Sequence, residues 1–305
     1  MNAPANLAEM TTTPEQILHR IDWQVIKRLD GLLQGDYRTL FYGAGIDFAD
    51  LRDYQPQDDV RHIDWNVTAR MNSPYVRQYV EDREITAWFL LDLSPSMVFG
   101  QPERPKINVL VDLVTALARL LTRKGNRVGA IRYNNQLEST IPPRTGRNQV
   151  LRLTRDLLAL TSMPTNTTTD LNTLIYAGLN TLKRRSLVFL ISDFISDPGW
   201  EKPLALLNQR HELVGIRLWD PVETALPDAG LIVVEDAETG EQLYVDTSDP
   251  VFRQRFFEAA EQRENVLKTN LRRAGVDLFS LSTEDHLVNA IVRMTTQRKR
   301  RRRGA

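Results

Sequence analysis

Short apolar runs alternate with segments of helical periodicity from residue 85 onward. The runs are rich in β-branched and aromatic residues and apolar on both faces, which predicts strands buried on both sides. Between them, apolar residues recur every three or four positions, which predicts helices. This alternation is typical of an α/β domain with a mostly parallel sheet flanked by helices. The predicted strands are 85–92, 127–133, 186–192, 212–219 and 276–282, and the predicted helices are 107–121, 150–160, 171–182, 252–271 and 285–294.

Two further segments have the pattern of antiparallel pairs. Residues 134–141 follow the second strand and predict a tight turn into an antiparallel edge strand. Residues 230–246 read as a hairpin whose turn lies in the sequence DAETG.

The first 80 residues follow a different pattern. An amphipathic helix is predicted at 17–33, followed by a polar and aromatic stretch rich in turn residues. A strand at 74–80 joins this region to the α/β domain. We therefore expect two domains, a helical and irregular/β region over 1–80 and the α/β domain over 81–305.

Composition excludes several classes of protein. The 305 residues include 39 basic and 39 acidic side chains, so no global field attracts nucleic acid or a membrane. Cysteine is absent, which excludes disulfides and cysteine-ligated metal sites. The chain offers no apolar run of about 18 residues and no signal-peptide pattern at its start. We expect a soluble cytoplasmic protein without a membrane span.

Six basic residues follow one another at 298–303. Like charges this close repel and bury nothing, so the segment predicts a solvated, disordered tail. A contact with nucleic acid or an acidic partner is the alternative, and the salt dependence of binding would reveal it.

Polar oxygens stand at the exits of two predicted buried strands. Asp92, Ser94 and Ser96 form a D-x-S-x-S pattern after the first strand, and Asp193 follows the third. Thr169 and Asp170 immediately precede a predicted helix. Ligands of open α/β sheets bind outside the carboxyl ends of the strands, and this set of hard oxygens suits magnesium or manganese. The alternative is that these side chains only cap helices.

The sequence offers little catalytic machinery. It has no P-loop, no complete dinucleotide fingerprint and no nucleophile elbow. Its four histidines are scattered without metal-ligand spacing. We therefore expect a binding protein rather than an enzyme.

The polar strand exits resemble the metal-ion-dependent adhesion site of the von Willebrand factor A fold. The resemblance implies a von Willebrand factor A-like domain whose magnesium site leaves one position for a carboxylate from the partner. Two features depart from that family: TNTT precedes the threonine where glycines are usual, and Phe194 stands where glycine often follows the aspartate. Carried over by motif, the metal ligands are Asp92, Ser94, Ser96, Thr169 and Asp193.

A longer match covers most of the chain. The stretch DFADLRDYQPQDDVRHIDWNVTAR, followed by YVRQYVEDRE and an acidic strand end, resembles the bacterial domain-of-unknown-function fifty-eight family. The resemblance implies a cytoplasmic module that works with a MoxR-type AAA+ ATPase in assembling, activating or inserting metal into a client protein. The matching residues are Tyr54, Asp58, Asp59, Arg61, Asp64, Trp65, Ala69 and Arg70.

These signature residues have a physical interpretation as well. Their carboxylates and guanidinium groups favour forked, charge-assisted hydrogen bonds that hold the irregular region together. A partner-docking surface is the alternative. For the whole chain we expect a magnesium-dependent protein-binding module; a metal-free scaffold and a nucleic-acid-associated factor remain the alternatives.

Overall fold

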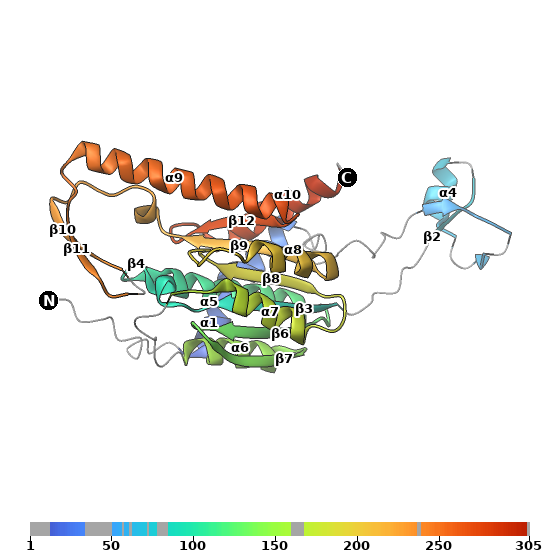
Figure 1. Ribbon diagram of the computed structural model, residues 1–305. Helices are drawn as coiled ribbons and strands as arrows, with labels where there is room; N and C mark the ends of the chain where they lie inside the picture. Colours follow the sequence, from blue (N-terminus) through green and yellow to red (C-terminus); the bar gives the residue numbers. More distant parts are fainter. Residues whose placement is uncertain are drawn as a thin grey trace. The chain divides into compact units, whose positions relative to one another are not determined.

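Figure 1 shows the computed structural model of the chain. The structure describes residues 13–33, 51–56, 58–60, 63–71, 73–77, 85–159, 168–236 and 239–303. Contacts divide the chain into two compact units. The larger unit comprises Met1–Phe41 with Ile85–Ala305, and the smaller unit is Tyr42–Glu84.

Six strands form the central sheet of the larger unit, in the order β12-β9-β8-β3-β6-β7. All neighbouring pairs are parallel except β6 and β7, which are antiparallel. Nearly every residue of β3 and β8 is buried, because helices cover both faces of the sheet. The predicted α/β fold class is confirmed, and the five predicted strands and the antiparallel edge strand are present. Burial on both sides does not hold for β12, an edge strand in which only Leu281 and Ser282 are buried. The bounds are β3 (Thr86–Asp92), β6 (Arg127–Tyr133), β7 (Leu137–Arg144), β8 (Leu187–Ser192), β9 (Glu212–Trp219) and β12 (Asp277–Ser282).

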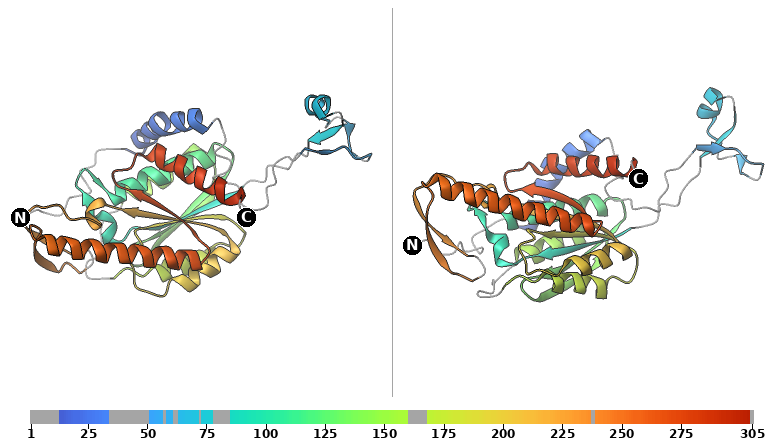
Figure 2. Two further views of the ribbon diagram at one scale, coloured as in Figure 1. Left: turned by 90° about the horizontal axis from the view of Figure 1, so that it is seen from above. Right: turned by 45° about the horizontal axis from the view of Figure 1, so that its top comes forward.

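The helices form one layer on each side of the sheet (Figure 2). On one side, α5, α6 and α10 pack against Phe89 and Leu91 of β3. On the other side, α7, α8 and α9 pack against Trp88 and Leu90, because successive residues of a strand point to opposite faces. Helix α8 was not predicted from the sequence. The bounds are α5 (Lys106–Thr122), α6 (Arg147–Leu158), α7 (Leu171–Thr181), α8 (Glu201–Arg210), α9 (Pro250–Arg273) and α10 (Leu287–Arg303).

The N-terminal helix runs through α1 (Pro14–Ile21), the π-helical turn η2 (Asp22–Ile26) and α2 (Lys27–Leu33). Leu18 and Leu29 are fully buried in the core that α5 and α6 share. Arg119 Nε of α5 donates to Asp22 Oδ1 at 2.7 Å. The helix therefore belongs to the α/β unit and not to a separate domain over 1–80. The observed division after Glu84 lies near the predicted boundary after residue 80.

The smaller unit contains an antiparallel pair of short strands and one helix. β1 (Leu51–Asp53) pairs with β2 (Tyr75–Arg77), and α4 (Trp65–Met71) lies between them in the sequence. The N–H of Tyr75 donates to the hydroxyl of Thr68 at 3.0 Å, which fastens the helix to the second strand. This strand confirms part of the one predicted at 74–80.

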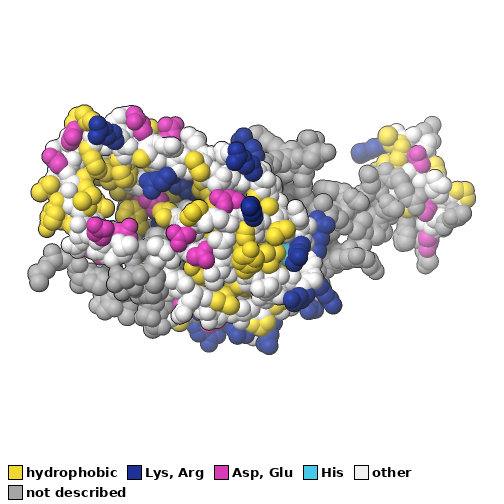
Figure 3. All heavy atoms as spheres, viewed as in Figure 1, with side chains coloured by type: hydrophobic (Ala, Val, Ile, Leu, Met, Phe, Trp, Pro, Cys, Tyr) yellow, Lys and Arg dark blue, Asp and Glu magenta, His cyan; other side chains and the backbone are white. Residues whose placement is uncertain are grey.

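The predicted hairpin is present as β10 (Leu231–Glu235) and β11 (Gln242–Asp246). Gly240 lies in its turn with φ +72°, a conformation that favours glycine. Apolar side chains gather over this hairpin in Figure 3. The exposed ones include Leu231, Leu243 and Tyr244.

The basic segment 298–303 forms the last turns of α10, so the prediction of a disordered tail is wrong. Arg298 is only 5% exposed, and its guanidinium pairs with Glu212 at the start of β9. This ion pair and the high helix propensity of arginine and lysine explain why the helix continues. Among the described residues, every helix is too short or too polar to cross a bilayer.

Candidate functional site

The central strand β3 and its neighbour β8 form the switch point of the sheet. The chain passes from β3 to β6 and β7 on one side, and then returns to β8, β9 and β12 on the other. Ligands of such sheets bind at the carboxyl ends of the strands where the direction of winding reverses. Asp92 ends β3 and Asp193 directly follows β8. Two predicted site residues therefore lie at the place that the topology favours for binding.

The Asp92 carboxylate is fully buried and held by two donors. The backbone N–H of Ser94 donates to Oδ1 at 3.0 Å, and the Ser192 hydroxyl donates to Oδ2 at 2.6 Å. Burial and the nearby charge of Asp193 raise the pKa of Asp92 from 3.8 to about 6, although the hydrogen bonds from Ser192 and Ser94 lower it. A cation at this position would favour the ionised carboxylate.

Ser94 and Ser96 bring two hydroxyls together beside Asp92. Both are buried, and the loop that carries them turns into the 3₁₀ helix η4 (Pro95–Val98). Their Oγ atoms lie 3.1 Å apart. Oxygen ligands of an octahedral magnesium ion lie about 2.1 Å from it, so adjacent ligands are separated by about 3 Å. The spacing of the two hydroxyls therefore fits adjacent ligands of one magnesium ion.

Thr169 is buried in a loop fastened to the same edge of the sheet. Its carbonyl accepts from the N–H of Asp197 in the loop after β8, at 2.9 Å. The N–H of Asp170 donates to the hydroxyl of Tyr133, which is paired with Asp92 across β3 and β6. The Asp170 carboxylate accepts from the N–H of Asn172 at 3.0 Å and caps α7. Capping, the alternative weighed from the sequence, therefore holds for Asp170.

Lys106 is a member of this cluster that the sequence did not reveal. Lys106 is the first residue of α5, and its side chain is fully buried. Its Nζ donates to Asp193 Oδ2 at 2.7 Å and pairs with Glu223. Burial lowers the pKa of Lys106, but the charges of Asp193 and Glu223 outweigh it and raise this pKa above its ordinary value. The other oxygen of Asp193 accepts from the N–H of Ile195 at 3.0 Å.

Asp220, at the end of β9, positions Glu223. Its carboxylate accepts from the Thr283 hydroxyl at 2.7 Å and from the N–H of Val222 at 3.0 Å. The second bond caps the short 3₁₀ helix η5 (Pro221–Glu223), whose last residue reaches Lys106. The pattern of apolar runs marks β9 but gives no sign that the turn after it meets the start of α5.

Phe194, which follows Asp193, has a backbone conformation that favours glycine. Its φ is +61°, in the left-handed region that costs a residue with a side chain about 1–2 kcal/mol. The phenyl ring is buried and lies 5.8 Å from the ring of Trp200. Burying an aromatic side chain contributes more than this backbone cost, so the structure accommodates the departure.

The site depends on hydroxyl ligands as well as carboxylates. Across the described ranges, no three side chains of histidine, cysteine, aspartate or glutamate are placed to hold a metal ion. Asp92 and Asp193 would need the serine and threonine oxygens to complete a coordination shell. The chemistry of this set still fits magnesium, because all its members are hard oxygens.

The signature residues of the smaller unit make local hydrogen bonds. Asp58 accepts from the N–H of Gln55 at 2.8 Å, and Asp64 accepts from the N–H of Val67 at 3.3 Å at the start of α4. Tyr54 donates its N–H to the carbonyl of Pro74 at 2.8 Å.

The other signature residues differ in exposure. Asp59 is half-buried and Arg70 is exposed. Trp65 is 68% exposed, which is unusual for so large an apolar side chain. Arg61 lies outside the described residues, so the predicted forked pairs remain a prediction.

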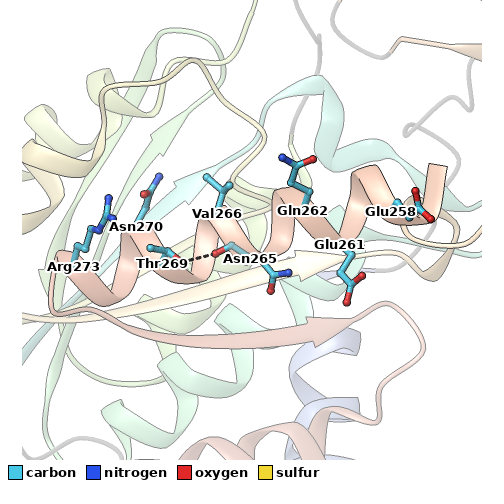
Figure 4. A pocket seen from close by; sticks show the side chains of 8 residues that line it. All are labelled: Glu258, Glu261, Gln262, Asn265, Val266, Thr269, Asn270 and Arg273. Atoms are coloured by element: carbon cyan, nitrogen blue, oxygen red, sulfur yellow. Dashed lines mark hydrogen bonds between the residues drawn. The ribbon is translucent and has the colours of Figure 1, made fainter. Parts of the chain in front are cut away.

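A separate hollow of about 500 Å³ lies along α9 (Figure 4). Polar side chains predominate around it, among them Glu258, Gln262 and Arg273. The Thr269 hydroxyl donates to the carbonyl of Asn265 at 2.8 Å within the helix. None of the residues that line the hollow belongs to the cluster at the strand ends.

Comparison with known proteins places this geometry in a family. The chain is 35% identical over 283 residues to the uncharacterized protein Mb1516 of Mycobacterium bovis, a match that covers 93% of this chain and 89% of the relative. BatB of Bacteroides thetaiotaomicron is similar in structure, with 14% identity and a TM-score of 0.45 over 71% of this chain and 99% of that one. A von Willebrand factor type A structure from Catenulispora acidiphila matches with 7% identity and a TM-score of 0.36, over 73% of this chain and 43% of that one. Residues 50–266 match the family described as "Protein of unknown function DUF58", and the chain belongs to that family.

Proposed function

We propose that this chain is a non-enzymatic, magnesium-assisted protein-binding module. The observation that carries the proposal is the placement of Asp92, Ser94, Ser96 and Asp193 at the switch point of the sheet. These side chains are buried, and two of them are carboxylates whose charges disfavour each other. A bound divalent cation would relieve that repulsion, which supports a metal at this position.

The ligands of this metal would be Asp92, Ser94, Ser96, Thr169 and Asp193. Ser192 would orient Asp92 through its 2.6 Å hydrogen bond, and the N–H of Ile195 would orient Asp193. When bound, magnesium supplies a positive centre that can accept a carboxylate from a partner protein. Partner recognition would then depend on an acidic side chain at the partner's surface.

The proposed partners extend the expectation that the sequence resemblance raised. We infer that the chain acts in the cytoplasm with a MoxR-type AAA+ ATPase on a client protein. Its role would be to help assemble or mature the client or to insert a metal into it. The binding chemistry expected at the strand ends suits such a role, because an adaptor needs a recognition site and no reaction of its own.

A matched pair of variants tests the proposal. The purified chain is mixed with a nucleotide-free MoxR-type AAA+ ATPase from the same organism, and complex formation is measured by calorimetry with magnesium or with EDTA. Asp92→Asn removes a charged ligand from the oxygen set. Asp156→Asn, the control, makes the same chemical change at an aspartate of α6 that pairs with Arg152 and lies outside the strand-end cluster.

The proposal expects magnesium-dependent binding by the wild type and by Asp156→Asn, and loss of that binding in Asp92→Asn. Equal binding by Asp92→Asn in its folded state would contradict it.

A metal-free scaffold is the second candidate. The observation that favours it is the ammonium of Lys106, which already pairs with Asp193 inside the cluster. In that case complex formation with the ATPase would be the same in EDTA and in magnesium. The oxygen cluster would then serve the fold rather than recognition.

The smaller unit supplies a candidate for a second contact with the partner. Trp65 is 68% exposed, and the carboxylate of the preceding Asp64 accepts from the N–H of Val67 in the first turn of α4. Exposed tryptophans often dominate the energy of protein interfaces. We expect Trp65→Ala to weaken binding to the ATPase at least tenfold while metal binding is unchanged. Unchanged affinity for the ATPase would remove the signature region from the interface.

A further inference from the structure

Lys106 occupies a position that ordinarily disfavours a positive charge. It is the first residue of α5, where the helix dipole places partial positive charge, and its side chain is fully buried. A buried ammonium is stable only when anionic groups surround it. Asp193 and Glu223 provide those groups, and the ring of Phe99 lies 5.8 Å from Nζ.

Asp193 therefore has two competing roles. One of its oxygens already accepts from the ammonium of Lys106 at 2.7 Å. The same carboxylate is a predicted metal ligand, and it lies close enough to Asp92 to raise the pKa of that residue. A divalent cation near Asp193 would be repelled by the ammonium, and solvent screens this repulsion poorly because both side chains are buried.

Glu223 differs from Asp193 because it contacts the ammonium from the side of β9. It ends η5, whose cap is the buried carboxylate of Asp220. Glu223 can still pair with the ammonium of Lys106 when Asp193 binds a metal ion. Glu223 is therefore a second anionic partner for Lys106, so the ammonium is not left as an isolated buried charge when Asp193 binds a metal.

We propose that Lys106 is a built-in competitor for the divalent cation. Its ammonium neutralises Asp193 in the metal-free protein, and Glu223 holds it when metal binds Asp193. This inference rests on the proposed metal site and adds the residue that sets its affinity. The competition weakens metal binding, so an additional carboxylate from a partner contributes more to filling the site.

Calorimetric titration of the metal-stripped, full-length chain with manganese chloride tests the inference. Lys106→Met keeps the length of the side chain and removes the competing charge, so we expect manganese to bind at least tenfold more tightly. Glu223→Gln leaves the ammonium with Asp193 alone, so we expect at least threefold weaker binding. Lys183→Met changes an exposed lysine and is the control, with affinity within twofold of the wild type.

The double variant Lys106→Met with Glu223→Gln guards against a failure to fold. It removes one charge of each sign, and its folding is checked by thermal melting. We expect it to bind manganese more tightly than the wild type. The weakening caused by Glu223→Gln should also be smaller without Lys106 than with it, because Glu223 acts through the ammonium.

The outcomes separate this inference from the proposed function. If the wild type shows no heat but Lys106→Met binds manganese, the competition stands and the metal-dependent function of the wild type falls. If both bind with equal affinity, the site stands and the competition is overturned. If neither folded variant lacking Lys106 binds manganese, both are overturned.

Discussion

Replacing Asp92 by asparagine should change how the stability of the metal-free protein depends on pH. The wild-type carboxyl is fully buried, and its pKa is raised from 3.8 to about 6 by burial and by Asp193. Asparagine has nearly the same shape and does not titrate. Its amide oxygen can accept from the N–H of Ser94, and its NH₂ group can donate to Ser192.

The sign follows from the raised pKa. Below pH 3.8 the carboxyl is protonated in both the folded and the unfolded chain, so it does not lower the free energy of unfolding. Between pH 3.8 and 6 the unfolded chain loses the proton first, and above pH 6 the folded protein also carries the buried charge. A pKa change of this size corresponds to about 3 kcal/mol of stability lost by the wild type, most of it between pH 4 and 7.

Urea denaturation in EDTA at pH 4.5, 5.5, 6.5 and 7.5 measures this difference. Subtracting the free energies of unfolding of the two proteins cancels every group that they share. About 1 kcal/mol of this loss has already occurred at pH 4.5, so we expect the wild type to lose about 2 kcal/mol relative to Asp92→Asn between pH 4.5 and 7.5. Magnesium at about 100 times its Kd should return about 2.7 kcal/mol to the wild type alone at pH 7.5. A difference that does not vary with pH would refute the raised pKa and the electrostatic argument for a cation.

Three other substitutions test the fold. Leu18→Ala should lower the free energy of unfolding of the α/β domain by about 3 kcal/mol, because this fully buried side chain packs in its core; an unchanged urea midpoint would contradict that packing. Phe194→Ala should destabilise the protein by about 3 kcal/mol in the same assay, since it removes the buried ring beside Trp200; an unchanged urea midpoint would contradict the packing of this ring. Arg298→Ala should lower the melting temperature by removing the ion pair with Glu212, whereas deleting residues 299–303 should not; the opposite order would assign the stabilising role to the basic end.

The strands were predictable because their chemistry is uniform over their whole length. β3 and β8 are buried on both faces, so nearly every position is apolar. Helix α8 was missed because its short sequence EKPLALLNQR contains proline and buries only Pro203, Leu204 and Leu207. The helical basic segment was also missed, since the pairing of Arg298 with Glu212 joins residues far apart in the sequence.

The candidate site was predictable only where it follows the strands. Asp92 and Asp193 were found because each directly follows an apolar run, and parallel strands bring such residues to one edge. Lys106 begins a helix and Glu223 ends a turn, positions where charged residues are ordinarily exposed. Only the folded sheet brings these two residues together beside Asp193.

The central claim is that the strand-end oxygens bind a divalent cation, and calorimetry of the metal-stripped protein with magnesium chloride tests it most directly. Wild type, Asp92→Asn and Asp156→Asn are titrated under the same conditions, with thermal melting to show that each is folded. The account predicts saturable heat for the wild type and Asp156→Asn and none for Asp92→Asn. Absence of saturable heat in the wild type, together with a melting temperature unaffected by magnesium, would contradict it.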